Sequence, residues 1–195
     1  MIMLALFDFL VGAMAVLAAI SARRKTLADV FSQIGYLSIA LAAFIGTTKF
    51  LGVSQLAQAH ILVSHAAAIV GVPFAAIAFF LLSRETKLWA SLAVGAVIVA
   101  GAILFWQSAT YALLAGVLAQ VIWLWAAWLQ RRVPGRILLR VIISVVLTTV
   151  AGLVFAGPGL FYGIEKLNIF HGLLALAILQ QSYAFSLTAK GHNPE

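Results

Sequence analysis

The chain has 195 residues, of which 65% are hydrophobic and 9% are charged, and its formal net charge is +7. Soluble domains are about half apolar and about a quarter charged, so this composition indicates a membrane protein without a separate catalytic domain. Cysteine is absent, which excludes disulfides, thiolate metal sites and thiol redox chemistry. The basic residues lie in short loops beside apolar runs, where they signal topology, so nucleic acid is not expected as a partner.

Seven continuous apolar runs, each able to cross ~30 Å of hydrocarbon, predict an all-α polytopic membrane protein with one transmembrane domain over residues 1–195. The expected helices cover residues 3–22, 29–48, 54–82, 88–106, 109–130, 136–156 and 167–188. Helices are favoured over a β-barrel because the runs do not alternate between apolar and polar residues. Pro73 lies inside the third run and predicts a kink, because proline removes one backbone hydrogen bond.

The charges of the loops predict an orientation in the cytoplasmic (inner) membrane. Basic residues follow the first, third, fifth and seventh runs, namely Arg23, Arg24, Lys25, Arg84, Lys87, Arg131, Arg132, Arg136 and Lys190. The opposite ends hold only Lys49, the uncharged segment 106–110 and the Glu165–Lys166 pair. The positive-inside rule therefore places the N-terminus outside and the C-terminus in the cytoplasm.

Two stretches of the sequence match each other at equivalent places between predicted helices. Residues 50–60 read FLGVSQLAQAH and residues 161–171 read FYGIEKLNIFH, so both contain F-x-G-[VI]-x-x-L-x-x-x-H. The first stretch joins the second and third runs, and the other joins the sixth and seventh. This match predicts two parallel repeats, about 3–82 and 109–188, connected by an inverting helix at about 88–106.

Through this order of helices the chain resembles the 3+1+3 seven-helix membrane proteins, a group that includes the SWEET-type sugar transporters and has been linked with the opsins. The resemblance covers the layout of the whole chain and no functional motif. It implies an architecture and favours transport, but names no substrate. A retinal protein is not expected, because the opsin lysine belongs midway along the last helix and Lys166 lies at its outer edge.

Parallel repeats are related by an axis along the membrane normal, so His60 and His171 are expected at the same depth. At 1.5 Å per residue they would lie roughly 6–9 Å inside the outer boundary. Gly52 and Gly163 are expected in turns with positive φ, which glycine adopts without a steric penalty. His65 is rotated ~140° from His60 around the same helix and is expected to make a core hydrogen bond instead.

Further ionisable residues collect at the outer end, and they define the candidate site. We expect an outward-facing pocket that binds a small solute, lined by Asp8, Lys49, His60, Glu165 and His171. Charges within a span are costly and usually face a cavity or pair with one another. A transporter-like solute binder is the leading interpretation, and a homo-oligomer is left open.

Other interpretations of the two histidines stay open at this point. They could bridge helices without any ligand, or His60 and His171 could together ligate haem b or a divalent metal in a membrane redox protein. A metal would require a third ligand, which Glu165 or Asp8 would have to supply. A membrane-embedded hydrolase is a further alternative, but no catalytic motif supports it, so an enzyme is not favoured.

Overall fold

The structure is a computed structural model that describes residues 2–21, 26–83, 88–130 and 135–191. Most of these residues are helical, as the sequence predicts. The helices are α1 (Ile2–Ser21), α2 (Leu27–Phe50), η1 (Ser54–Leu56), α3 (Ala57–Ala66), η2 (Ala67–Gly71), α4 (Val72–Ser83), α5 (Leu88–Leu104), α6 (Ala109–Leu129), α7 (Arg136–Val150), η3 (Ala151–Phe155) and α8 (Lys166–Gly191). Two short strands, β1 (Leu160–Phe161) and β2 (Ile164–Glu165), complete the described elements.

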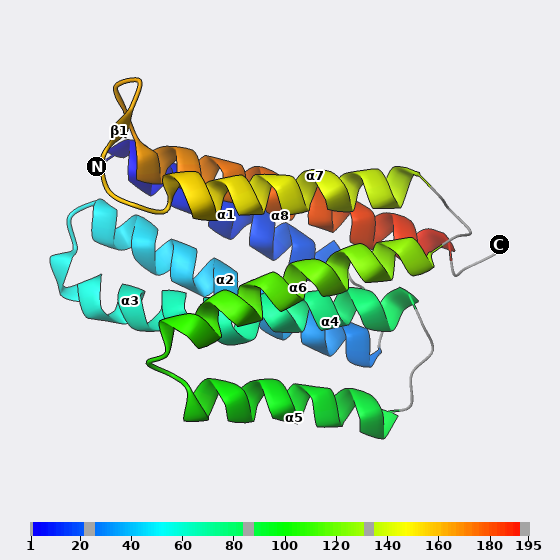
Figure 1. Ribbon diagram of the computed structural model, residues 1–195. Coiled ribbons are helices and arrows are strands. Elements are labelled where there is room, and N and C mark those ends of the chain that lie inside the picture. Colours follow the sequence, from blue (N-terminus) through cyan, green and yellow to red (C-terminus); the bar gives the residue numbers. More distant parts are fainter. Residues whose placement is uncertain (1, 22–25, 84–87, 131–134, 192–195) are drawn as a thin grey trace.

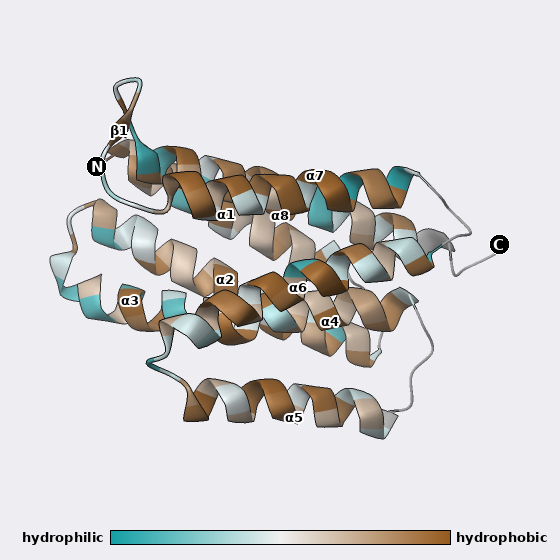
Figure 2. Ribbon diagram, viewed as in Figure 1, coloured by the Kyte–Doolittle hydropathy of each residue, from teal (hydrophilic) through white to brown (hydrophobic). Residues whose placement is uncertain are grey.

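Six apolar helices are long enough to cross a membrane. Their bounds are Ile2–Ser21, Leu27–Phe50, Ser54–Ser83, Ala109–Leu129, Arg136–Phe155 and Lys166–Thr188. The seventh expected span is a shorter apolar helix, α5. Figure 2 shows hydrophobic residues along the length of every helix, and many large apolar side chains are exposed on the outside of the bundle. These surfaces suit hydrocarbon and would be unfavourable in water, so the chain is membrane-embedded.

The six long helices form a closed ring in which each helix packs against the next. Around the ring the order is α1, α2, α4, α6, α7 and α8, and α8 packs again on α1. Helix α5 lies outside this ring against α4 and η2, at the lower edge of Figure 1. The ring leaves a central space that six different helices can line.

The third span is continuous but not a regular α-helix. A π-helical turn, η2, precedes α4, and the amide of Val72 donates to the carbonyl oxygen of Ala67, five residues back. Pro73 follows directly and has no amide hydrogen to donate to the carbonyl of Ile69. The predicted irregularity around Pro73 is therefore present as a π-turn, a feature that is frequent at functional sites.

Helix α2 packs closely against the junction of η2 and α4, where α2 carries Gly35 and η2 ends at Gly71. A Cβ atom on Gly35 would lie 2.6 Å from the backbone nitrogen of Ala75 and 2.8 Å from the carbonyl oxygen of Gly71. A Cβ atom on Gly71 would meet the Ser38 hydroxyl. The absence of side chains at Gly35 and Gly71 lets the two backbones touch, as in other membrane helix pairs.

The two matching stretches differ in local structure. In the first, Gly52 (φ 118°) leads into the 3₁₀ turn η1, whereas in the second, Tyr162 (φ 50°) and Gly163 (φ 81°) form the tip of the β1–β2 hairpin. Positive φ at both central residues is the signature of a type I′ turn. The prediction of positive φ at Gly52 and Gly163 is confirmed, while the hairpin itself was not expected from the sequence.

Candidate functional site

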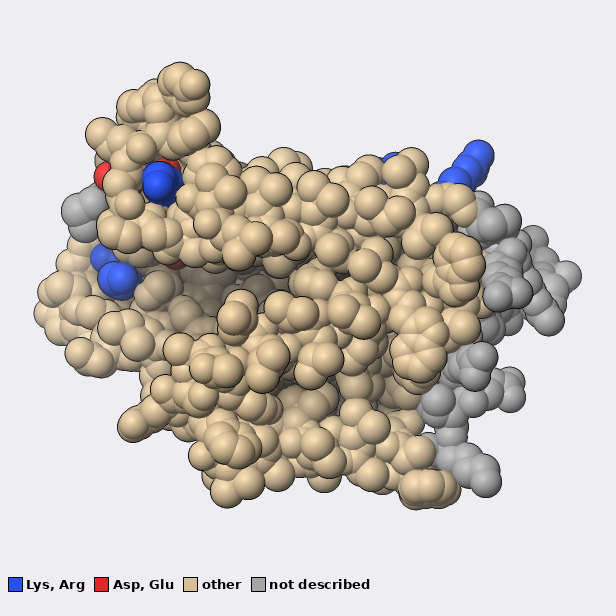
Figure 3. Space-filling view, in the orientation of Figure 1, with Lys and Arg blue, Asp and Glu red and all other residues tan. Residues whose placement is uncertain are grey.

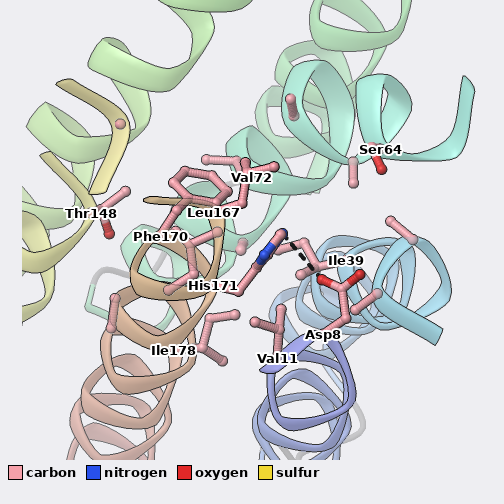
Figure 4. A pocket seen from close by; sticks show the side chains of 18 of the residues that line it. Asp8, Val11, Ile39, Ser64, Val72, Thr148, Leu167, Phe170, His171 and Ile178 are labelled. Carbon is pink, nitrogen blue, oxygen red and sulfur yellow. Dashed lines mark ion pairs between the residues drawn. The ribbon is translucent and has the colours of Figure 1, made fainter. Parts of the chain in front are cut away.

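The centre of the site is an ion pair between the first and last helices. His171 Nε2 on α8 lies 3.1 Å from Asp8 Oδ1 on α1, and Figure 4 shows the two side chains facing each other. Asp8 is only 2% exposed, although it lies in an otherwise apolar helix. Burial of an unpaired carboxylate among apolar side chains would be strongly unfavourable. The contact with His171 therefore explains why Asp8 can be buried in α1.

His60 approaches the same carboxylate from α3. A Cβ atom on Gly46 of α2 would meet Asp8 Oδ2 and would lie 2.7 Å from His60 Nε2. Both polar atoms therefore lie close to the place that a Cβ atom at position 46 would occupy, so any larger residue there would displace them. The glycine makes room for Asp8 and His60 to approach, with His171 on the other side of the carboxylate.

Lys49 lies at the end of α2 beside this group. Its Nζ is 4.4 Å from the centre of the Phe50 ring, and that ring packs edge-on against His60 at 5.8 Å. No carboxylate of the described residues lies within 4.0 Å of the Lys49 ammonium. The lysine is thus held by an aromatic face, an arrangement that leaves its charge able to attract an anion.

These side chains line a cavity of about 520 Å³ at the centre of the helix ring. Its polar lining consists of Asp8, Lys49, His60, Ser64, Gln120, Thr148, His171 and Gln181. The remaining wall is apolar and consists of Val11, Ile39, Ala42, Ala43, Phe50, Ala67, Ala68, Val72, Ala75, Trp123, Gly152, Leu167, Phe170, Leu174, Ala177 and Ile178. A concave, mostly apolar space of this size with a few convergent polar groups is typical of a small-molecule site.

Glu165, the fifth predicted site residue, lies elsewhere. It borders a second cavity of about 570 Å³ under the hairpin, together with Leu4, Lys49, Phe50, Ser54, Ala57, Pro158, Gly159, Leu160 and Leu167. Lys49, Phe50 and Leu167 border both spaces. The structure therefore brings Asp8, Lys49, His60 and His171 together around one cavity, whereas Glu165 lines a second cavity that shares only Lys49 with this set.

His65 has the structural role that its rotation predicts. Its Nε2 donates to the carbonyl oxygen of Trp106, and its ring packs edge-on against the Trp106 ring at 4.9 Å. It does not belong to the lining of the central cavity. The expectation of a core hydrogen bond for His65 is confirmed.

Four polar residues of the cavity were missed from the sequence: Ser64, Gln120, Thr148 and Gln181. The Gln181 amide oxygen accepts from the hydroxyl of the fully buried Tyr36 at 3.1 Å, and Thr148 donates to the Ser144 carbonyl at 2.9 Å. The signal for the two glutamines was present, since an amide in the middle of an apolar run is an intramembrane polar group that requires a partner.

Several polar atoms at the site have no hydrogen-bond partner among the described residues. They include Asp8 Oδ2 and Gln120 Oε1. The described part of the chain also contains no group of three or more His, Asp or Glu side chains that could hold a metal ion. The three-ligand metal site, with His60 and His171 plus Asp8 or Glu165, consequently has no support in these residues.

The chain matches no family model, no curated protein and no solved structure in the comparisons with known proteins. The cavity and its side chains are therefore the features that indicate a function.

Proposed function

We propose that the protein is a small integral membrane protein that binds a small solute in its central cavity and acts as a transporter. The observation that carries the proposal is the buried Asp8–His171 pair, which opens onto a space of about 520 Å³ beside His60 and Lys49. A purely structural ion pair would be closed off by packing. Here the pair borders an open cavity, in which a solute can also reach the side chains of His60 and Lys49.

The proposal includes the seven-span 3+1+3 topology with the N-terminus outside. The order of the ring supports it, because α1, α2 and α4 followed by α6, α7 and α8 is the order that two parallel halves would give around a two-fold axis. Arg23, Arg24 and Lys25 and most of the other basic residues that set the orientation lie outside the described residues. Their count in the sequence still favours a cytoplasmic location for those loops.

The shared wall between the two cavities suits alternating access. Lys49, Phe50 and Leu167 stand between the central cavity and the one under the hairpin, so a small shift of α2 against α8 would join or part the two spaces. Transporters commonly move one bundle against another around a fixed site near the centre of the membrane. Asp8 and His171 come from the two proposed halves and would form such a site.

The test is solute exchange in liposomes that contain the purified protein. A panel of radiolabelled amino acids, sugars and small carboxylates is screened for saturable uptake, and His60→Ala and His171→Ala are then measured with any solute taken up. Each variant is expected to lose at least ~90% of the uptake, because each removes a hydrogen-bonding group from the cavity.

The matched control is His65→Ala, which removes a histidine from α3 without touching the cavity and is expected to keep its uptake. Folded yield is compared by gel filtration for all variants. If His60→Ala and His171→Ala transport like the parent, the site is wrong. A visible absorption band of haem in the purified protein would instead favour the redox alternative.

A further inference from the structure

The central cavity is elongated and mainly apolar. His171 near one end and Gln181 near the other are ten residues apart on α8, which corresponds to about 15 Å along the helix. Figure 4 shows Val11 and Ile178 on one side of the Asp8–His171 pair and Leu167 and Phe170 on the other. A fully hydrated solute would leave most of this wall without favourable contacts, whereas a hydrocarbon chain would fill it.

The cavity reaches the flank of the bundle beside α7. Gly152 of η3 lines the cavity and is also exposed, and a Cβ atom added to it would meet no heavy atom within 4 Å. Figure 3 shows a hollow on this flank, between α7 and the helices α3 and α6, and Figure 1 shows α6 and α7 diverging towards the hairpin end. In a membrane this flank faces acyl chains, so the opening connects the cavity with the bilayer.

The polar end of the cavity favours an anion. A buried pair such as Asp8 and His171 is most stable when its charges sum to zero, because an uncompensated charge there is costly. No carboxylate of the described residues lies within 4.0 Å of the Lys49 ammonium, which borders the same cavity as His60. An incoming carboxylate or phosphate would accept hydrogen bonds from both.

We propose that the cavity takes an anionic single-chain amphiphile from the bilayer, holds its headgroup at Lys49 and His60, and places its hydrocarbon chain along the apolar wall towards Ile178. The ligand enters sideways past Gly152, between α6 and α7. The inference rests on the proposed function, because it names the substrate class of the same cavity.

The experiment measures binding of radiolabelled palmitate to the full-length protein in phosphatidylcholine nanodiscs, with empty nanodiscs as the blank. Saturable binding is expected, and unlabelled palmitate should compete at least tenfold better than methyl palmitate, which lacks the charge, and than butyrate, which lacks the chain. Lys49→Met is expected to weaken palmitate binding at least tenfold.

The entry route is tested after folding, because the chain contains no cysteine. Gly152→Cys is purified and its thiol is then modified with a benzyl methanethiosulfonate, which should abolish palmitate binding by blocking the opening. Gly116→Cys, treated in the same way, is the matched control: a Cβ atom at Gly116 also meets nothing within 4 Å, but Gly116 does not line the cavity. This control should bind like the parent.

Two results would overturn the inference. One is the absence of saturable binding above empty nanodiscs, and the other is equal competition by methyl palmitate or by hexadecyltrimethylammonium. If palmitate does not bind while uptake of a water-soluble solute depends on His60 and His171, only the amphiphile is wrong. If neither histidine variant changes any uptake and palmitate still binds, the transport proposal fails and the binding site stands.

Discussion

Asp8 and His171 form the contact on which the site depends, and both residues also line the central cavity. Asp8 Oδ2 is buried without a hydrogen-bond partner among the described residues. A buried polar atom without a partner destabilises the fold by about 1–3 kcal/mol. The contact with His171 at the other carboxylate oxygen therefore contributes to stability, while the position of both residues in the cavity wall makes them available for binding.

The ion pair should be detectable as an energetic coupling. Asp8→Ala and His171→Ala are each expected to lower the free energy of unfolding. The double variant should lower it by less than the sum of the two single changes, with a coupling energy of about 1–3 kcal/mol. The reason is that either single change leaves the other group buried and unpaired. The measurement is a double-mutant cycle from unfolding in mixed micelles.

A second pair at the other end of the bundle provides the control for that cycle. Arg140 Nη1 donates to Gln180 Oε1 at 2.7 Å, well away along α7 and α8 from the Asp8 contact. Asp8→Ala combined with Arg140→Met should be additive within about 0.5 kcal/mol. Additivity of the Asp8 and His171 changes would show that the pair is not formed.

The level of the site along the membrane could be predicted from the sequence, but the direction of each side chain could not. The ends of the apolar runs place Asp8, Lys49, His60 and His171 at one level, and the structure brings these four together. Glu165 shares that level, yet it lies in a hairpin strand that turns it towards the second cavity. The direction of the Glu165 side chain depends on the type I′ turn of the hairpin. Tyr162 is an unusual residue at the first central position of such a turn, so the local sequence does not predict the hairpin.

Among the elements, the crossing of α2 with η2 and α4 fixes the shape of the cavity. The close approach at Gly35 and Gly71 holds α2 against the π-turn, and residues on both sides of this turn line the cavity. The kink near Pro73 was predictable because proline lacks an amide hydrogen. The π-turn was not predictable from the local sequence, because it depends on how α2 packs against the backbone carbonyl groups that Pro73 leaves without a donor.

Gly35→Ala should therefore destabilise the protein by about 1–3 kcal/mol, since its methyl group would collide with the backbone of Ala75 and Gly71. Neither backbone can move away without separating α2 from α4. The measurement is the unfolding free energy in mixed micelles. Gly116→Ala is the matched control, because a methyl group there meets nothing within 4 Å.

The control should remain within about 1 kcal/mol of the parent or gain stability, because alanine favours a helix more than glycine does. Equal stability for Gly35→Ala and the parent would mean that the crossing is looser than the structure shows. A loss of stability in both Gly35→Ala and Gly116→Ala would indicate a general effect of replacing glycine.

For the whole molecule, the main question is whether α5 crosses the membrane with the six longer helices. Its 17 residues give a length of about 26 Å, slightly less than the ~30 Å of hydrocarbon. A mismatch of this size is tolerated through local thinning of the bilayer. Helix α5 also runs alongside α6 in Figure 1, as a crossing helix would.

Single cysteines can decide both the number of spans and their orientation, because the chain has none of its own. Arg24→Cys precedes α2, Arg132→Cys follows α6, and Tyr162→Cys lies at the tip of the hairpin, where Tyr162 is 92% exposed. With seven spans, four helices separate Arg24 from Arg132 and place them on the same side, and one more helix places Tyr162 opposite. If α5 did not cross, Arg24 and Arg132 would lie on opposite sides.

A membrane-impermeant maleimide is expected to label Tyr162→Cys in intact spheroplasts, and to label Arg24→Cys and Arg132→Cys only after permeabilisation, because the positive-inside rule predicts a cytoplasmic location for the basic loops. Labelling of Arg24→Cys and Arg132→Cys without permeabilisation would reverse the orientation, and labelling of only one of these two would remove α5 from the set of spans.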